Sequence, residues 1–185
     1  MTAAFSRPHP GLGEFVVRPL DVDGDLALLH GWVTAPRARF WLMQGMSAAE
    51  VAAAYREIEA SAHHDAFLGL VDGVPQFLTE RYAPAHDPVG RAYEVRSGDV
   101  GMHLLVGPAD RPRAGFTTAV MRTVMAFLFA DPAVARVVVE PDADNTAIHR
   151  LNERVGFVPG YVVDVGTKKA LLSFSTRESF ERSAA

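Results

Sequence analysis

Two side chains able to exchange a proton belong to two apolar segments. His103 lies within residues 99–106, and Glu140 ends the apolar run 134–140. A neutral imidazole accepts a proton near physiological pH, and an adjacent carboxylate orients the ring and stabilises its charged form. We place Glu140 first as the partner of His103 and keep Asp142, two positions later, as the alternative. From the residues alone, the simpler interpretation is that His103 is a hydrogen-bonded core histidine and that Glu140 is a solvated strand end.

A helix preceded by a glycine-bearing loop follows the His103 segment. Residues 115–130 carry apolar side chains at helical spacing, and Arg111, Arg113 and Gly115 lie at the entrance. The free N–H groups and the positive dipole end at a helix start favour a pyrophosphate. An ordinary strand-to-helix turn with exposed arginines explains the same residues about equally well, because glycine-rich loops are a weak signal.

Composition argues against several other functions. The formal net charge of -4 makes nucleic acid and anionic membranes poor partners. The chain has no Cys, which excludes disulfides and a cysteine nucleophile and favours a cytoplasmic location. No apolar run has the length of a membrane span. His63, His64 and Asp65 are of metal-ligand types, but adjacent strand positions point to opposite faces, so we expect no metal.

The hydrophobic pattern predicts a mixed sheet with helices, an α/β (α+β) fold of six or seven strands and about four helices. Strands are expected at 15–20, 67–71, 76–82, 99–106, 134–140, 161–165 and 170–175. Helices are expected from Asp23, from the capping box Ser47-Ala48-Ala49-Glu50 to Ala62, over 115–130, and from Asn145 to Gly156. One domain over 15–176 is expected, with a flexible lead-in over 1–14, which lacks the features of a signal peptide, and a tail over 177–185.

Segment 145–157 resembles a motif of the GNAT acyltransferases. It runs Asn-Thr-Ala-Ile-His-Arg-Leu-Asn-Glu-Arg-Val-Gly-Phe, with the family's final basic-x-Gly-Phe. The loop 112–117, Pro-Arg-Ala-Gly-Phe-Thr, resembles the family's phosphate loop at Gly115, although its leading basic residue is displaced. Many members carry a tyrosine in the last helix as general acid, and Asn152 takes that position here. The motifs cover residues 98–160, and the element order extends the resemblance over nearly the whole chain.

A narrower resemblance is to the siderophore-biosynthesis branch of this family. Segments 98–108 and 140–145 carry it, and Phe40-Trp41 and 77–82 also fit. That branch acylates hydroxylamines or amines made from lysine, ornithine or cadaverine, and a strand histidine with an acidic residue on the next strand is regarded as its catalytic pair. The resemblance therefore implies catalytic roles for His103 and Glu140. It also implies formation of a hydroxamate from N-hydroxycadaverine and acetyl-CoA or succinyl-CoA, as in the desferrioxamine pathway.

The same resemblance implies where the two substrates bind. Acyl-CoA is expected beside the His103 strand and at the start of the next helix. The residues expected to contact it are Leu104, Leu105, Val106, Arg113, Ala114, Gly115, Phe116, Thr117, Thr118 and Asn145. For the amine substrate we expect Glu80 at the distal ammonium, with Trp41 or Tyr82 beside the aliphatic stem. Aromatic residues near strands usually belong to the core, so this last assignment competes with a simple packing role.

Two other functions fit the sequence. One is a GNAT enzyme that acylates an ordinary amine, such as an antibiotic, a polyamine or a protein N-terminus. The other is an acyl-CoA-binding module without catalysis, which the altered phosphate loop and Asn152 favour slightly. The sequence leaves open the acyl group and the oligomeric state, monomer or weak dimer.

Overall fold

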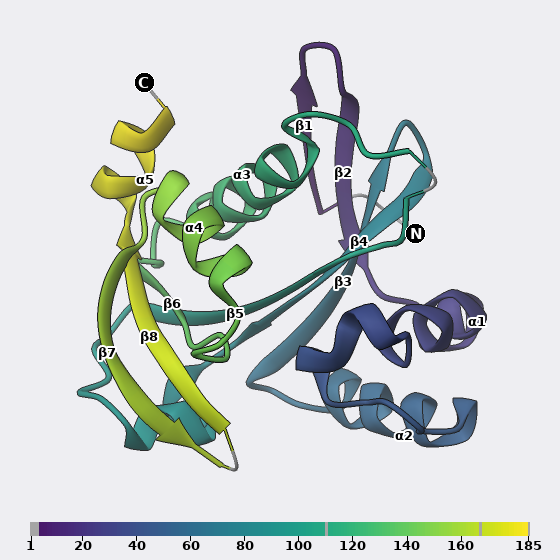
Figure 1. The fold of residues 1–185 in the computed structure, drawn as a ribbon, viewed down its shortest axis with the longest axis horizontal. Helices are drawn as coiled ribbons and strands as arrows, with labels where there is room; N and C mark the ends of the chain where they lie inside the picture. Colours follow the sequence, from purple (N-terminus) through teal and green to yellow (C-terminus); the bar gives the residue numbers. More distant parts are fainter. Residues whose placement is uncertain (1–3, 110, 167, 185) are drawn as a thin grey trace. The chain divides into compact units, whose positions relative to one another are not determined.

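The computed structural model describes residues 4–109, 111–166 and 168–184. Its strands form one mixed sheet in the order β1-β2-β3-β4-β5-β6-β8-β7 (Figure 1). The strands are β1 Phe5–His9, β2 Gly13–Pro19, β3 His64–Val71, β4 Val74–Tyr82, β5 Asp99–Val106, β6 Arg136–Val139, β7 Val158–Val165 and β8 Lys168–Thr176. The helices are α1 Val22–Val33, α2 Ala48–Glu59, α3 Phe116–Phe129, α4 Thr146–Arg154 and α5 Arg177–Ala184. The predicted class is confirmed, with eight strands instead of six or seven.

The chain folds into two compact units, each described here by itself. The first comprises Met1–Glu80 and Leu104–Phe116, and the second comprises Arg81–His103 and Thr117–Ala185. Among the described residues, no helix is long and apolar enough to cross a membrane.

The core of the first unit lies between antiparallel strands and two helices. Strand β2 pairs with β1 and β3, and its inward residues Phe15 and Val17 are fully buried. Helices α1 and α2 pack against each other (Figure 1) and bury one apolar cluster with β3 and β4. The predicted capping box is confirmed, because Ser47 and Glu50 each accept a hydrogen bond from the other's backbone N–H.

The N-terminal segment corrects the expectation of a flexible lead-in over residues 1–14. Residues Phe5–His9 form β1, which pairs with β2 from Phe5↔Val17 to His9↔Gly13. The His9 ring packs edge-on against Phe15 at a centroid distance of 4.6 Å. Pro8 weakened the strand signal, because proline lacks an N–H and is confined to edge strands, and β1 is such an edge. Residues 1–3 lie outside the described part of the chain.

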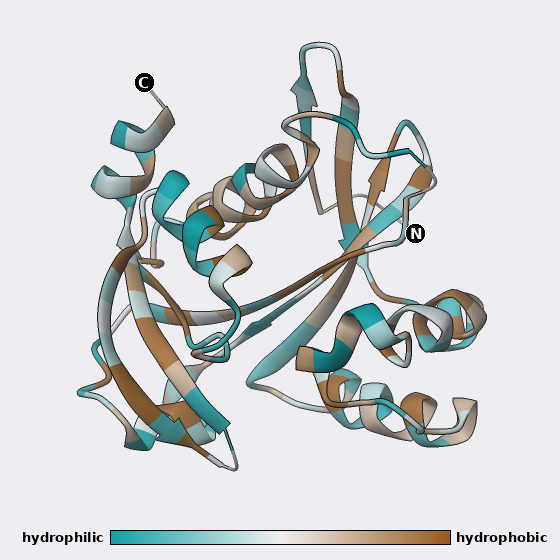
Figure 2. Cartoon of the chain, viewed as in Figure 1, coloured by the Kyte–Doolittle hydropathy of each residue, from teal (hydrophilic) through white to brown (hydrophobic). Residues whose placement is uncertain are grey.

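Strands β5, β6, β8 and β7 organise the second unit. Strands β5 and β6 are parallel over only three pairs, from Asp99↔Arg136 to Gly101↔Val138, although β5 continues to Val106. Strand β6 then pairs antiparallel with β8, and β8 with β7. Figure 2 shows hydrophobic colour along the middle of β8, where Leu172 is fully buried, and mostly hydrophilic colour on α4.

A partly buried ion pair joins β5 to β6 where both strands begin. Nε and Nη2 of Arg136 each donate to the Asp99 carboxylate at 2.7 Å, and the Tyr93 hydroxyl donates to it at 3.0 Å. Burial raises the pKa of Asp99, but these hydrogen bonds and one from the Arg96 backbone outweigh burial and lower it. The guanidinium of Arg136 also stacks over Phe174 of β8, so the pair links three neighbouring strands.

The expected C-terminal tail is a helix in the structure. In α5, Phe180 is buried and stacks on Phe129 at a centroid distance of 5.6 Å. Arg177 donates to the carbonyls of Phe129, Asp131 and Val134, at and beyond the end of α3. A cation at a helix C-terminus satisfies free carbonyl groups there, which attaches this segment to the unit.

The close approach of β5 to Tyr82 gives a first prediction. A Cβ at Gly101 would lie 2.1 Å from the Tyr82 ring, so Gly101→Ala must displace that ring. We expect the free energy of unfolding to fall by about 1–3 kcal/mol in urea titrations. The matched control is Gly31→Ala in α1, where nothing apart from the adjoining backbone of the helix itself lies within 4 Å of the added methyl. We expect that change to be neutral or to stabilise by up to about 1 kcal/mol, and equal losses in both variants would contradict the prediction.

Candidate active site

His103 and Glu140 meet in the second unit, as the sequence predicted. Nε2 of His103 lies 3.0 Å from Oε1 of Glu140. His103 comes from β5 and has a side chain that is 34% exposed, so it is open to a substrate. Glu140 directly follows the buried residues of β6 and is 4% exposed. The structure therefore combines an accessible imidazole with a buried carboxylate.

Two further groups contact the carboxylate of Glu140. The hydroxyl of Tyr82, at the end of β4, donates to Oε2 at 2.6 Å. Nζ of Lys168, at the start of β8, lies 3.6 Å from Oε1. Because a buried charge without partners is strongly unfavourable, these contacts explain how Glu140 is accommodated in its charged form.

The electrostatics of the cluster keep Glu140 ionised. Burial by itself raises the pKa of Glu140, but the attraction and hydrogen bond of His103, the charge of Lys168 and the hydrogen bond of Tyr82 outweigh it. The pKa of Glu140 is thereby lowered from 4.5 to about 2. Burial and the adjacent carboxylate raise the pKa of Tyr82 well above 10, so its hydroxyl remains a hydrogen-bond donor.

Tyr82 and Asp142 differ from the predicted arrangement. Tyr82 was predicted beside the aliphatic stem of the substrate, but it is 3% exposed and packs against the His103 ring at a centroid distance of 4.9 Å. Its place is therefore with the His103–Glu140 pair. Asp142 accepts a hydrogen bond from the Asp144 backbone at 2.9 Å and forms a backbone bridge with Ala170. Glu140 contacts His103, and the described contacts of Asp142 are to the Asp144 backbone and Ala170.

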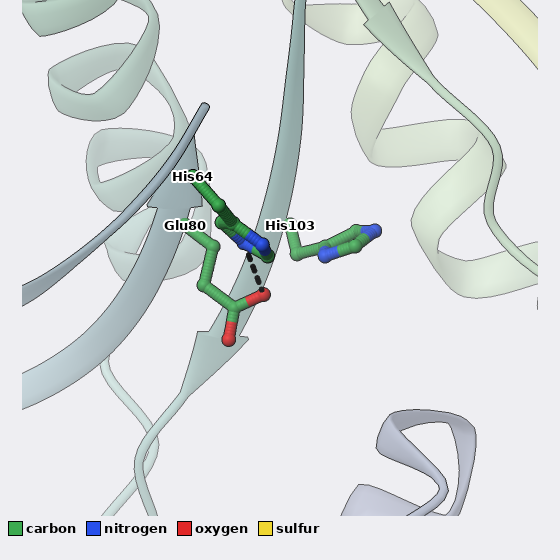
Figure 3. Close-up of side chains that lie close together, drawn as sticks. All are labelled: His64, Glu80 and His103. Atoms are coloured by element: carbon green, nitrogen blue, oxygen red, sulfur yellow. Dashed lines mark ion pairs between the residues drawn. The ribbon is translucent and has the colours of Figure 1, made fainter. Parts of the chain in front are cut away.

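A second buried carboxylate lies in the first unit. Glu80 accepts a hydrogen bond from the Tyr55 hydroxyl at 2.8 Å, and its Oε2 lies 3.4 Å from Nε2 of His64 (Figure 3). Nε1 of Trp41 donates to the Tyr55 oxygen at 3.1 Å. Burial and the Glu80 charge raise the pKa of Tyr55 well above 10. The structure thus links the predicted substrate residues Trp41 and Glu80 through Tyr55, which the sequence patterns did not single out.

The predicted phosphate loop leads directly into α3, which begins at Phe116. Gly115 has a φ of +76°, in the left-handed region that favours glycine, and the space beside it is open. The Arg113 guanidinium donates to the Leu12 carbonyl at 3.2 Å and lies over the Phe116 ring at 4.4 Å. Arg113 is thus engaged within the protein, which leaves the backbone as the main feature of this loop for binding an anion.

Three more of the predicted co-substrate residues follow His103 on β5. The Val106 carbonyl accepts a hydrogen bond from Arg37 at 2.7 Å. Leu105 packs against the apolar cluster of α1 and α2, and Leu104 is partly buried. These contacts give the end of β5 a defined place in the core of the first unit.

The remaining predicted co-substrate residues lie near helix starts. Ala114 and Thr117 are exposed. Thr118 in α3 accepts a hydrogen bond from Arg154 at 3.4 Å, so the basic residue of the Arg-x-Gly-Phe motif contacts α3. Asn145 is the N-cap of α4, as predicted, and accepts a hydrogen bond from the Ile148 backbone at 3.4 Å.

Together, the sheet, the loop-to-helix unit and the His–Glu pair define a protein of the acyltransferase class. Residues 21–165 match the family model described as the acetyltransferase (GNAT) domain. The chain belongs to the GNAT acetyltransferase family. The family resemblance carried by segment 145–157 is therefore confirmed.

Two relatives are named for N-hydroxylated amines. The chain is 30% identical over 165 residues to the N(6)-hydroxylysine O-acetyltransferase of Escherichia coli. The aligned region covers 88% of this chain and 52% of that protein. It is 24% identical over 166 residues to the N-hydroxyputrescine acetyltransferase of Acinetobacter baumannii, and the aligned region covers 90% of this chain and 79% of that protein. The chain thus spans about half of the first relative. These similarities support the narrower resemblance to the siderophore branch.

A solved structure supports the fold. AAC(6')-Ib, in complex with paromomycin and acetyl-CoA, matches with a TM-score of 0.81 at 23% identity, covering 92% of this chain and 98% of that chain. At this identity the likeness concerns the fold alone, and it confirms the GNAT arrangement of strands and helices.

The lowered pKa of Glu140 gives a prediction on stability. A carboxyl group whose pKa falls from 4.5 to about 2 on folding stabilises the folded state above about pH 4.5, and this contribution is lost as the pH falls towards 2. Glu140→Gln is expected to lower the free energy of unfolding near neutral pH by about 3 kcal/mol. It should also flatten the decline in stability between about pH 4.5 and 2.

Urea titrations across this pH range measure both effects. The matched control is Asp142→Asn, which removes a nearby acidic group whose carboxylate accepts a hydrogen bond from the Asp144 backbone, and it should keep the wild-type profile. A wild-type profile in Glu140→Gln would show that the buried charge does not contribute to stability.

Proposed function

We propose that this protein transfers an acyl group from acyl-CoA to the hydroxylated nitrogen of an N-hydroxylated diamine, forming a hydroxamate for siderophore biosynthesis. N-hydroxycadaverine is the proposed substrate, with acetyl-CoA or succinyl-CoA as the donor. The observation that carries the proposal is the accessible imidazole of His103 held against buried Glu140. Similarity to two relatives named for N-hydroxylated amines supports this choice of substrate class.

The residues present fit an acyl-CoA. Asn152 in α4 is 3% exposed, and neither polar atom of its amide has a hydrogen-bond partner among the described residues. A buried unpaired amide is unfavourable by about 1–3 kcal/mol, and the pantetheine arm offers amide and thiol groups that would pair with it. The exposed loop before α3 offers backbone N–H groups at a positive helix end, which suit the pyrophosphate.

In the proposed mechanism His103 acts as the base. The substrate nitrogen attacks the thioester carbon, a C–N bond forms, and His103 takes the proton that the nitrogen loses. The C–S bond then breaks and CoA leaves as a thiolate, which takes a proton from solvent, while Glu140 stabilises the imidazolium. A backbone N–H of segment 103–106 is the proposed donor to the oxyanion. The chain has no cysteine, and we propose direct transfer without an acyl-enzyme.

A hydroxylamine substrate suits a modest base. Its nitrogen is less basic than that of an alkylamine, so more of it is already neutral near physiological pH. The enzyme then contributes mainly by aligning the nitrogen with the thioester. Asn152 cannot serve as an acid, and the proposal assigns protonation of the departing CoA thiolate to solvent.

The distal ammonium of the substrate is assigned to Glu80. Glu80 is a buried carboxylate, and a cationic group of a substrate would interact favourably with its negative charge. We propose that the substrate ammonium binds beside it, with Trp41 and Tyr55 beside the aliphatic stem. Tyr82 is instead assigned to holding Glu140.

The remaining assignments stay predictions. These are the desferrioxamine pathway, the cytoplasmic location, and a monomer or weak dimer.

Release of free CoA tests the substrate. The purified chain is assayed with N-hydroxycadaverine, cadaverine and paromomycin, each with acetyl-CoA and with succinyl-CoA. We expect the highest kcat/KM with N-hydroxycadaverine. A clear preference for cadaverine or paromomycin would replace the hydroxamate function with acylation of an ordinary amine. CoA binding without release for any amine would support a non-catalytic module.

His103→Asn tests the base. We expect kcat/KM to fall by a factor of about 10² to 10⁴, because the side chain no longer accepts the proton. The control is His30→Asn, which changes a histidine that contacts the Met46 carbonyl in the first unit. It should retain activity, and thermal melts confirm that both variants fold. Equal activity in His103→Asn and the wild type would rule out the proposed base.

A further inference from the structure

Lys168 contacts the same carboxylate oxygen as His103. Its Nζ lies 3.6 Å from Oε1 of Glu140, and Nε2 of His103 lies 3.0 Å from that oxygen. The Lys168 side chain is 24% exposed, so solvent screens its charge only in part. The next residue, Lys169, is 72% exposed and pairs with Asp164 at 3.1 Å. Of these two lysines, Lys168 is the one joined to the proposed catalytic pair.

A histidine held against a buried carboxylate is at a disadvantage as a base. The negative charge stabilises the imidazolium and so favours a ring that is already protonated. Glu140 carries this charge, since in spite of burial its contacts lower its pKa. A ring protonated before the substrate arrives cannot accept the proton of the substrate, so an opposing charge is needed.

We propose that Lys168 is a positioning residue that keeps the imidazole of His103 uncharged before the reaction, by sharing the negative charge of Glu140. This inference rests on the proposed role of His103 as the base. Because both nitrogens contact one oxygen, the lysine charge and the ring lie within about 7 Å, which is inside the screening length of about 8 Å in physiological salt. Repulsion between them opposes protonation of the ring, while Glu140 continues to orient it.

The other described groups that contact the His103 ring in the second unit do not oppose its protonation. Glu140 favours the charged ring. Tyr82 packs on the ring from the end of β4 and stays neutral, because burial and Glu140 raise its pKa well above 10. Among the described contacts of Glu140 in the second unit, Lys168 on β8 contributes an amino group. His64 and Glu80 of the first unit are titratable as well, and variants at these positions measure what they contribute.

The pH dependence of kcat/KM tests the inference. The full chain is assayed with N-hydroxycadaverine and acetyl-CoA as wild type, Lys168→Met and Lys168→Arg. Removing the cation makes the ring easier to protonate. The acid limb of the Lys168→Met profile should therefore shift to higher pH by about one pH unit. Activity should then be about tenfold lower on the acid limb and equal to wild type well above it. Lys168→Arg should restore the wild-type limb.

Lys169→Met is the matched control, because it removes the same charge at a neighbouring position outside the cluster. It should leave the profile unchanged. A purely structural role of Lys168 would instead lower the activity by the same factor at every pH. That outcome, or a similar shift in Lys169→Met, would overturn the inference.

A measurement without catalysis separates this inference from the proposed function. The imidazole of His103, assigned by comparison with His103→Asn, is titrated by NMR in the unliganded protein. The inference predicts an upward shift in Lys168→Met that persists when His64→Gln or Glu80→Gln is added. If the His103 imidazole titrates at the same pH in a folded Lys168→Met variant as in the wild type, the inference is overturned. Lys168→Gln replaces Lys168→Met in this measurement if Lys168→Met does not fold. Failure of the wild type to release CoA would reject the proposed function, whereas the titration would still decide the role of Lys168.

Discussion

A carboxylate that is only 4% exposed, as Glu140 is, has to find in the protein the stabilisation that water no longer provides. In the second unit this stabilisation comes from three different strands. Tyr82 ends β4, His103 lies in β5 and Lys168 begins β8. These groups converge on one carboxylate only when the strands pair correctly. The condition that makes the buried charge stable is therefore the same condition that assembles the proposed catalytic pair.

The Asp99–Arg136 ion pair stands at the start of the pairing between β5 and β6. In this parallel pair of strands Asp99↔Arg136 is followed by Val100↔Val137 and Gly101↔Val138, where the pairing ends. His103 and Glu140 follow two residues beyond that last pair on each segment, and their side chains meet at 3.0 Å. The ion pair and the proposed catalytic pair thus stand at the two ends of one short stretch of paired strand.

How much the sequence predicted depends on whether a signal is local. The capping box at Ser47, the cap at Asn145 and the bounds 99–106 were right, because neighbouring residues determine them. Strand β1 was missed because Pro8 obscured a pattern that pairing with β2 stabilises. Lys168 was missed for a different reason. It follows a turn next to Lys169 and looks like a solvated charge until the pairing of β6 with β8 brings it near Glu140.

The two buried glutamates have the same construction, and this similarity bears on how the proposed reaction is divided. Glu80 and Glu140 each accept a hydrogen bond from a buried tyrosine and each contact a histidine. At Glu140 the amino group of Lys168 is a further contact of the carboxylate, and in the proposed mechanism the histidine there accepts a proton. At Glu80 the described contacts include Tyr55 and His64. In the proposed function this second carboxylate binds a cationic group of the substrate. The proposal therefore assigns the same side-chain types to proton transfer in one place and to charge recognition in the other.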